Sequence, residues 1–207
     1  MNSTLILASA SPRRRELLAQ AGYRFVVDPA SIPESLRPGE DAIRFATRLA
    51  REKAEEVFAR HASSTAPVVV LGADTVVVCD GEVMGKPVDA GDAQRMLLLL
   101  SGRTHQVVTG VAVVWGPGSA EVAAEITQVT MRTLSPQEIA AYAATGEPMD
   151  KAGAYAIQGY AARWIPRIQG CYFNVVGLPL SLVAALLEGA ERRLASQLDS
   201  AKDLTLR

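Results

Sequence analysis

APVVVLGADTVVVCDGEVMGKP, residues 66–87, is a valine-rich stretch interrupted by a single acid. Such short apolar runs bounded by turn residues are typical of buried strands. We expect a strand before residues 72–74, a break at these residues, a second strand after them, and a turn at Asp80-Gly81. An acid among apolar residues needs a partner when buried, which a metal ion or an activated water would supply. The alternative is that Asp74 caps its own turn.

The segments on either side alternate between strand and helix patterns. Pro12 follows the N-cap residue Ser11 at the start of a helix, and Gly22 ends it. Ser135 and Glu138 form a capping box. We expect strands over 4–9 and 24–29, helices over about 40–61, 89–102, 135–146 and 179–197, and a hairpin of two strands joined by GPGSA at 116–120. Crossovers together with a hairpin predict an α/β protein with a mixed sheet and flanking helices.

Composition places the chain among globular proteins and excludes several classes. Its 207 residues are 49% hydrophobic and 21% charged, with a net charge of −1, so no global basic field attracts nucleic acid or a membrane. Two cysteines, Cys79 and Cys171, form no disulfide framework, and the N-terminus has no signal-peptide pattern. No apolar run is long enough to span a bilayer. We therefore expect a cytoplasmic protein that binds neither nucleic acid nor membrane.

The turn LASASPRRR, residues 7–15, predicts an anion site. It places the N-terminus of a helix, with its free N–H groups, directly after a strand. Ser9 and Ser11 add hydroxyl groups, and Arg13 and Arg14 add fork-shaped donors suited to phosphate. Adjacent cations are unfavourable at that end of a helix unless an anion binds there. The alternative is a solvated basic turn.

The helix expected over 40–61 contains a lysine on its apolar face. Ile43, Ala46, Ala50 and Val57 follow helical spacing and predict one buried stripe, and Lys53 falls inside that stripe. An inward lysine needs a partner or a ligand, unless its stem only crosses the edge of the stripe and its ammonium reaches water.

Three further candidates carry weaker signals. Lys86 follows a glycine in a loop, Glu34 lies in a loop rich in Pro, Ser and Glu, and Gln158 lies among small residues where its amide could read a nucleobase. Loop charges are often only solvated. Neither histidine has metal-ligand spacing, and GxSxG, P-loop and GxGxxG motifs are absent. Together the candidates indicate phosphoryl chemistry on a nucleotide.

The motifs resemble one protein family in order and over residues 4–185. They are LASASPRRRELL, RLAREKA, LGADTVV, GKPVDAGDA, MLLLLSGRTHQVVTG, DKAGAYAIQG and NVVGLPL. This set is similar to the Maf family of nucleoside triphosphate pyrophosphatases. The resemblance implies an elongated mixed sheet of the inosine triphosphate pyrophosphatase type, with two lobes around a cleft. It implies one domain over 1–190, with the helix end and a frayed polar tail over 191–207.

The resemblance also implies an activity and the residues that carry it. A Maf enzyme cleaves between the α- and β-phosphates of a nucleoside triphosphate, with a divalent cation such as Mg²⁺ or Mn²⁺. Asp74 matches the catalytic base, and Ser9, Arg13, Arg14, Lys53 and Lys86 match phosphate ligands. Glu34 and Asp74 are the candidate metal ligands. The partner is then the nucleotide itself, with a homodimer as one candidate assembly.

Three positions are similar to the dTTP/UTP branch of the family. Arg13, Thr75 and Gln158 stand where the branch acting on 7-methyl-GTP tends to have Trp, Gln and Glu. An amide suits the neutral bases thymine and uracil, whereas cationic 7-methylguanine prefers an acid. We expect hydrolysis of dTTP and UTP, or house-cleaning of modified pyrimidine nucleotides. The alternatives are the 7-methyl-GTP branch, a phosphatase, and a nucleotide-binding regulator of cell division without turnover.

Overall fold

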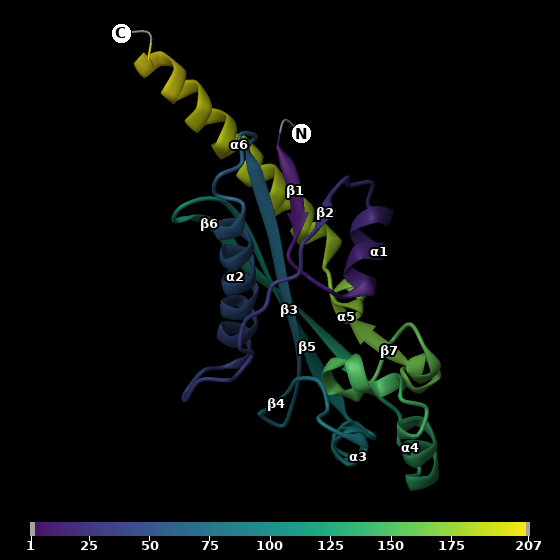
Figure 1. The fold of residues 1–207 in the computed structure, drawn as a ribbon. Coiled ribbons are helices and arrows are strands. Elements are labelled where there is room, and N and C mark those ends of the chain that lie inside the picture. Colours follow the sequence, from purple (N-terminus) through teal and green to yellow (C-terminus); the bar gives the residue numbers. More distant parts are fainter. Residues whose placement is uncertain (1–2, 206–207) are drawn as a thin grey trace.

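A computed structural model describes residues 3–205, with side-chain surroundings for residues 3–197. It has one seven-stranded sheet with helices on both faces (Figure 1). This confirms the predicted α/β class. The elements are β1 (Thr4–Leu7), α1 (Pro12–Gln20), β2 (Val26–Val27), α2 (Ala42–Arg60), β3 (Val68–Cys79), β4 (Glu82–Met84), α3 (Ala90–Leu100), β5 (Thr104–Gly116), β6 (Ser119–Thr130), α4 (Pro136–Ala143), η1 (Glu147–Asp150), η2 (Ala152–Ala154), η3 (Tyr160–Trp164), β7 (Arg167–Gln169), α5 (Tyr172–Val176) and α6 (Leu180–Thr205).

The sheet is mixed and elongated, as predicted. Its strand order is β2-β1-β3-β5-β6-β7, with β4 paired to β3. β1 runs parallel to β2 and β3, and the other pairs are antiparallel. The long strands β3 and β5 run through the whole molecule, from β1, β2 and α1 at one end to α3 and α4 at the other (Figure 1). They join two lobes.

The predicted break at residues 72–74 is wrong, because β3 continues through them as a twelve-residue strand. Gly72 pairs with Ala112 of β5 and Asp74 pairs with Gly110, so the ladder is uninterrupted on that side. The acid does not end the strand because Lys53 accompanies it in the interior. The partner that this buried acid needs is therefore Lys53 of α2, and no turn at Asp74 is required.

The opposite edge of β3 has a gap. β1 pairs with residues 68–71 of β3 and β4 pairs with residues 77–79, so residues 72–76 have no strand partner on this side. Side chains alternate along a strand. Val70 and Val76 pack on the α2 face and Ala73 packs on the opposite face, so Asp74 faces α2 and Thr75 faces away from it. At this gap, polar side chains from both faces of the sheet therefore lie next to the same open strand edge.

Several smaller predictions need correction. Ile43 was expected in the buried stripe of α2 but is 45% exposed, because the first turn of α2 packs on the sheet through Ala42 and Phe45 instead. α6 continues to Thr205, past the expected end at residue 197. The expected strand over 24–29 is reduced to two paired residues. The capping box at Ser135 is present as predicted. Among the described residues, no helix combines the length and hydropathy needed to cross a bilayer.

Two glycines bring α2 unusually close to the sheet. A Cβ atom on Gly72 would lie 2.2 Å from the carbonyl oxygen of Ala50, and one on Gly110 would lie 2.3 Å from that of Ala46. Both contacts are impossible for any larger residue without moving the helix backbone. The close approach sets the depth at which side chains of α2 reach β3, and Lys53 is one of them.

We predict that Gly110→Ala destabilises the protein by about 1–3 kcal/mol, because overpacking forces α2 away from the sheet. Thermal and denaturant unfolding of the variant measure this. Gly85→Ala is the matched control, since a Cβ atom there meets nothing within 4 Å. Equal stability of the two variants would contradict the packing argument.

Candidate active site

One cavity of about 540 Å³ lies at the gap in β3. It collects side chains from both lobes and from both faces of the sheet. All nine residues that the sequence singles out line it: Ser9, Arg13, Arg14, Glu34, Lys53, Asp74, Thr75, Lys86 and Gln158. Segments far apart in the sequence therefore meet around one space. Their individual roles remain predictions.

The centre of the cavity wall is a lysine between two carboxylates. Lys53 Nζ lies 2.6 Å from Oδ1 of Asp74 and 2.7 Å from Oε1 of Glu34. Lys53 and Asp74 are buried, whereas the side chain of Glu34 is half-exposed. The sequence predicts a partner for this inward lysine, and the structure supplies two. Although the sequence predicts Lys53 as a phosphate ligand, its ammonium is already engaged with these carboxylates.

The two carboxylates have pKa values shifted in opposite directions. Burial raises the pKa of Asp74, although the charges of Lys53 and Arg14 oppose this effect. Burial alone would also raise the pKa of Glu34, but the hydrogen bond and charge of Lys53, with the charges of Lys86 and Arg14, outweigh it and lower that pKa. Divergent pKa values in one pair are characteristic of acid–base sites. Asp74 is thus suited to accept a proton, and Glu34 to remain an anion.

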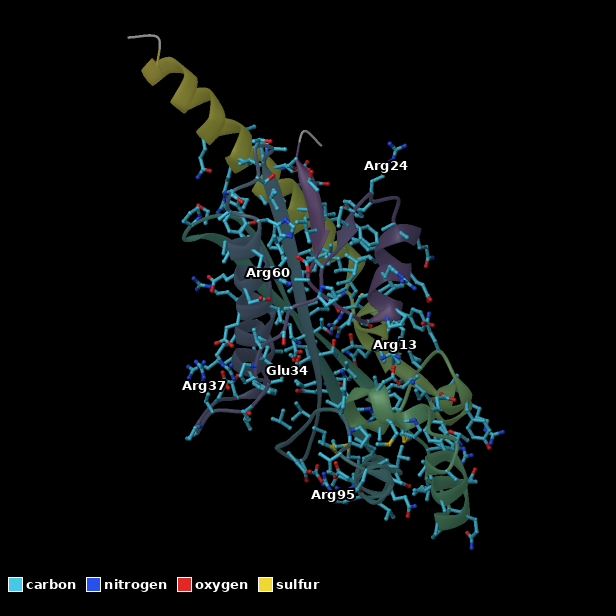
Figure 2. The ribbon with its side chains drawn as sticks, in the orientation of Figure 1. Arg13, Arg24, Glu34, Arg37, Arg60 and Arg95 are labelled. Carbon is cyan, nitrogen blue, oxygen red and sulfur yellow. The ribbon has the colours of Figure 1, made fainter. Side chains whose placement is uncertain are left out.

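Arg13 reaches across the cavity to the other lobe. Its Nη1 donates to Oδ2 of Asp150 at 3.0 Å and its Nη2 to the carbonyl oxygen of Asp150 at 3.3 Å. Lys151 Nζ donates to the other carboxylate oxygen of Asp150 at 2.5 Å. In Figure 2, Arg13 lies at the start of α1 and Glu34 lies beside α2, on the other side of the central strands. Charged side chains therefore reach the cavity from both sides of the central strands.

The start of α1 offers the backbone donors that the sequence predicts. Ser11 is the N-cap but its side chain accepts no hydrogen bond from the first turn, and that turn contains no acid. Pro12 has no N–H group. The N–H groups of the next two residues have no partner within the helix and are available to an anion. Ser9 is buried and accepts from the N–H of Ser11 at 3.2 Å. This helix end lines the cavity.

Arg14 is partly buried in the cavity wall and supports the strand that carries Asp74. Its guanidinium donates to the carbonyl oxygen of Ala73 at 2.8 Å, to Thr75 Oγ1 at 3.0 Å and to the carbonyl oxygen of Gly177 at 2.9 Å. It also donates to Ser9 Oγ at 3.3 Å. Arg14 thus holds the residues on both sides of Asp74.

Thr75 is likewise engaged within the protein. Its hydroxyl oxygen accepts from Arg14 and lies 2.9 Å from the hydroxyl of Thr109, which donates to the carbonyl oxygen of Asn174. The two threonine hydroxyls share one hydrogen bond. The sequence predicts Thr75 as a specificity residue, and its hydroxyl is already engaged with Arg14 and Thr109.

Lys86 and Gln158 are exposed members of the cavity wall. Among the side chains that the structure describes, neither makes an ion pair or a hydrogen bond, so both have polar groups available to a ligand. Gln158 lies in a turn near the 3₁₀ segments of the second lobe. Its position is compatible with the predicted contact to a nucleobase, because an amide both donates and accepts.

The carboxylates fit a divalent cation that is shared with a substrate. Within residues 3–197, no group of three or more His, Cys, Asp or Glu side chains is placed to hold a metal ion. Glu34 and Asp74 nevertheless direct one oxygen each toward the same ammonium. Mg²⁺ is commonly bound by one or two carboxylates with phosphate oxygens and water completing its coordination. The donor set therefore suits a metal that arrives with a phosphate group.

Two charged residues of the cavity were not predicted from the sequence. Asp150 and Lys151 both line it and contact each other, and Asp150 also pairs with Arg13. Lys151 further donates to the carbonyl oxygen of Glu147 at 2.6 Å. Their signal was present as two adjacent charges before the small residues of KAGAYA. Only contact with a distant segment distinguishes such charges from ordinary loop charges.

Comparisons with known proteins show what the chain is similar to. The family model described as Maf-like protein matches residues 4–190. The dTTP/UTP pyrophosphatase of Koribacter versatilis is 52% identical over 186 residues, covering 90% of this chain and 94% of that protein. The dTTP/UTP pyrophosphatase of Geobacter sulfurreducens is 56% identical over 177 residues, covering 85% and 91%. A solved nucleoside-triphosphatase, described as dITP/XTP pyrophosphatase, from Mycobacterium abscessus aligns with 94% of this chain and 97% of its own at 15% identity and a TM-score of 0.43.

We predict that Lys53→Met raises the pKa of Asp74 further, because the variant removes the nearest positive charge and leaves the carboxylate buried. Carbon NMR titration of the Asp74 carboxyl group measures the change without any assay of activity. Lys86→Met is the control. It removes an equal charge from the cavity wall, but that charge acts on the pKa of Glu34 and is not among the causes of the shift of Asp74. An unchanged or lowered pKa of Asp74 in Lys53→Met would contradict this reading of the site.

Proposed function

The chain belongs to the Maf family, and from this membership and the geometry of the cavity we propose that it hydrolyses nucleoside triphosphates to the monophosphate and pyrophosphate. The observation that carries the proposal is the buried Asp74 carboxylate, which shares a cavity with the open N-terminus of α1 and with cations of both lobes. A base beside a phosphate-binding surface is what hydrolysis of a phosphoanhydride requires.

Asp74 accepts a proton from the attacking water. The water oxygen forms a bond to the α-phosphorus, the bond from that phosphorus to the bridging oxygen breaks, and pyrophosphate leaves with the bonding electrons. A raised pKa makes Asp74 a stronger base than an ordinary aspartate. Protonation of Asp74 removes its ability to accept a proton. Because its pKa is raised, activity should fall on acidification at a higher pH than it would for an aspartate with an ordinary pKa.

The other residues hold the substrate and stabilise its charge. Arg13 and Lys86, with the N–H groups at the start of α1, bind the phosphates. Lys53 and Arg14 keep Asp74 ionised and in place, and contribute positive charge behind the reacting phosphate. Glu34 and Asp74 would hold a divalent cation, Mg²⁺ or Mn²⁺, which neutralises phosphate charge when bound.

The substrate class follows from the relatives and from Gln158. The curated relatives at about half identity are named dTTP/UTP pyrophosphatases. Gln158 is exposed in the cavity wall and carries an amide that matches the neutral edge of thymine or uracil. Normal or modified pyrimidine nucleoside triphosphates are therefore the proposed substrates, in a cytoplasmic house-cleaning role.

The product of the reaction tests the proposal. With dTTP or UTP and Mg²⁺ or Mn²⁺, the protein should release pyrophosphate and monophosphate in equal amounts. Asp74→Asn should lower this rate by about 10²–10⁴-fold, the usual contribution of a general base, with its circular dichroism spectrum unchanged. Release of orthophosphate first would indicate a phosphatase, and binding without product would indicate a regulator. A rate of Asp74→Asn near that of the wild type would remove Asp74 from its role.

We further predict that Gln158→Glu lowers kcat/KM for dTTP and UTP several-fold, because a carboxylate cannot donate to the carbonyl groups of these bases. The same change should favour 7-methyl-GTP relative to dTTP, since an acid suits a cationic base. Gln169→Glu adds the same charge at an exposed position outside the cavity and serves as the control. Unchanged relative rates across the nucleotide panel would exclude Gln158 from base recognition.

A further inference from the structure

Glu34 is half-exposed and lies in the segment 28–41, which contains no helix or strand. A single ion pair to Lys53 joins it to the cavity wall. An exposed side chain on an irregular segment loses conformational freedom when it is fixed, and one such pair compensates little of that loss. Something else must hold the segment in the position that presents Glu34.

Arg48 of α2 contacts this segment with two of its three guanidinium nitrogens, Nε and Nη2. Its Nε and Nη2 donate to the two carboxylate oxygens of Glu40 at 2.6 and 2.7 Å, which is a bidentate pair. Nη2 also donates to the carbonyl oxygen of Ser35 at 3.0 Å, and Nη1 donates to Glu52 at 3.1 Å. The side chains of Arg48 and Glu40 are only 15% and 9% exposed.

Glu40 closes a turn at the end of the segment. Its carboxylate accepts from the N–H of Arg37 at 3.1 Å, and its own N–H donates to the carbonyl oxygen of Arg37. Gly39 supplies the left-handed conformation, with φ of 75°, that this turn needs. Arg48 therefore grips both a closed turn and the carbonyl of Ser35, the residue that directly follows Glu34.

The same helix, α2, carries several attachments of the segment. Arg60 donates to the carbonyl oxygen of Pro29, Arg37 pairs with Glu52, and Ile32 packs against the cluster that contains Phe45 and Leu49. Arg48 holds residues 35–40 and Lys53 holds the carboxylate of Glu34, and both belong to α2. The fork of Arg48 is preorganised for a carboxylate, so it loses less freedom than a lysine would on making these bonds. Arg48 also keeps the pKa of Glu40 at about 2, so the pair stays ionised at any pH used to assay the protein.

We propose that Arg48 is a positioning residue of the active site: by clamping residues 35–40 onto α2, it holds the Glu34 carboxylate at Lys53 and at the cavity. This inference rests on the proposed function for the part that Glu34 plays in turnover. The clamp itself does not depend on that function. Arg48 touches neither the cavity nor a reacting group.

The experiment compares Arg48→Met with Arg51→Met in the full chain. Arg51 lies on the same helix and is exposed, and within the described side chains it pairs only with Glu55 one turn away. Its variant therefore removes an equal charge without touching the segment. Hydrogen exchange measured by mass spectrometry reports on the amides of residues 35–41. We expect them to exchange at least tenfold faster in Arg48→Met and at the wild-type rate in Arg51→Met.

Turnover separates positioning from a purely structural role. Arg48→Met should lower kcat/KM about tenfold, and should lower it no further in a protein that already carries Glu34→Gln, because both changes remove the same carboxylate from its place. Glu40→Gln, which keeps the shape of the partner, should have the same effects in weaker form and replaces Arg48→Met if that variant does not fold. Unchanged exchange overturns the clamp. Faster exchange with normal kcat/KM, or with effects that add to those of Glu34→Gln, overturns the positioning role. Absence of turnover in the wild type would instead overturn the proposed function and leave the exchange result standing.

Discussion

The ammonium of Lys53, held between the carboxylates of Asp74 and Glu34, is the interaction on which this site depends. A buried aspartate in the middle of a strand is too costly to keep without a compensating charge. That charge can reach it only because Gly72 and Gly110 let α2 lie directly on the sheet. The packing of two backbones thus determines the protonation behaviour of one carboxyl group. A change in the packing of α2 on the sheet would therefore also change the chemistry of the site.

The place of the site follows from the topology of the sheet. A strand edge without a partner normally leaves donors and acceptors exposed. Here the edge of β3 between β1 and β4 is covered by Arg14, which takes the carbonyl of Ala73 and the hydroxyl of Thr75. The guanidinium replaces a neighbouring strand over this short distance, and it brings a positive charge where a strand would bring none. The cavity lies at the same gap, and residues that face opposite sides of the sheet, Asp74 and Thr75, both line it.

The sequence was a good guide wherever a residue contradicted its own surroundings. Lys53 inside an apolar stripe and Asp74 inside an apolar strand both indicate partners, and the structure joins them. The helix caps and the hairpin were equally readable, because they depend on neighbouring residues. The predicted break at Asp74 was wrong because it was inferred from neighbouring residues alone. The positive charge that lets Asp74 stay within the strand comes from Lys53, 21 residues away in the sequence.

Other features depend on contacts that no local pattern records. Arg13 and Arg14 are adjacent and chemically identical, yet one crosses the cavity and the other braces the strand. Arg48, Asp150 and Lys151 look like ordinary surface charges until the fold gives each a partner.

The pairing of charges around the cavity also indicates which cations can bind phosphate. Breaking a buried pair such as Lys53–Asp74 leaves an uncompensated charge and costs about 3–5 kcal/mol, whereas an exposed pair is worth about 0–1 kcal/mol. Asp150 is 59% exposed, so its bond to Arg13 belongs to the second kind. A polyphosphate entering the cavity can therefore displace Asp150 from Arg13 at little cost, while Lys53 stays with its carboxylates. Of the proposed phosphate ligands, Arg13 would then exchange Asp150 for phosphate and Lys86 has no partner among the described side chains to give up, while the Lys53 pair stays fixed.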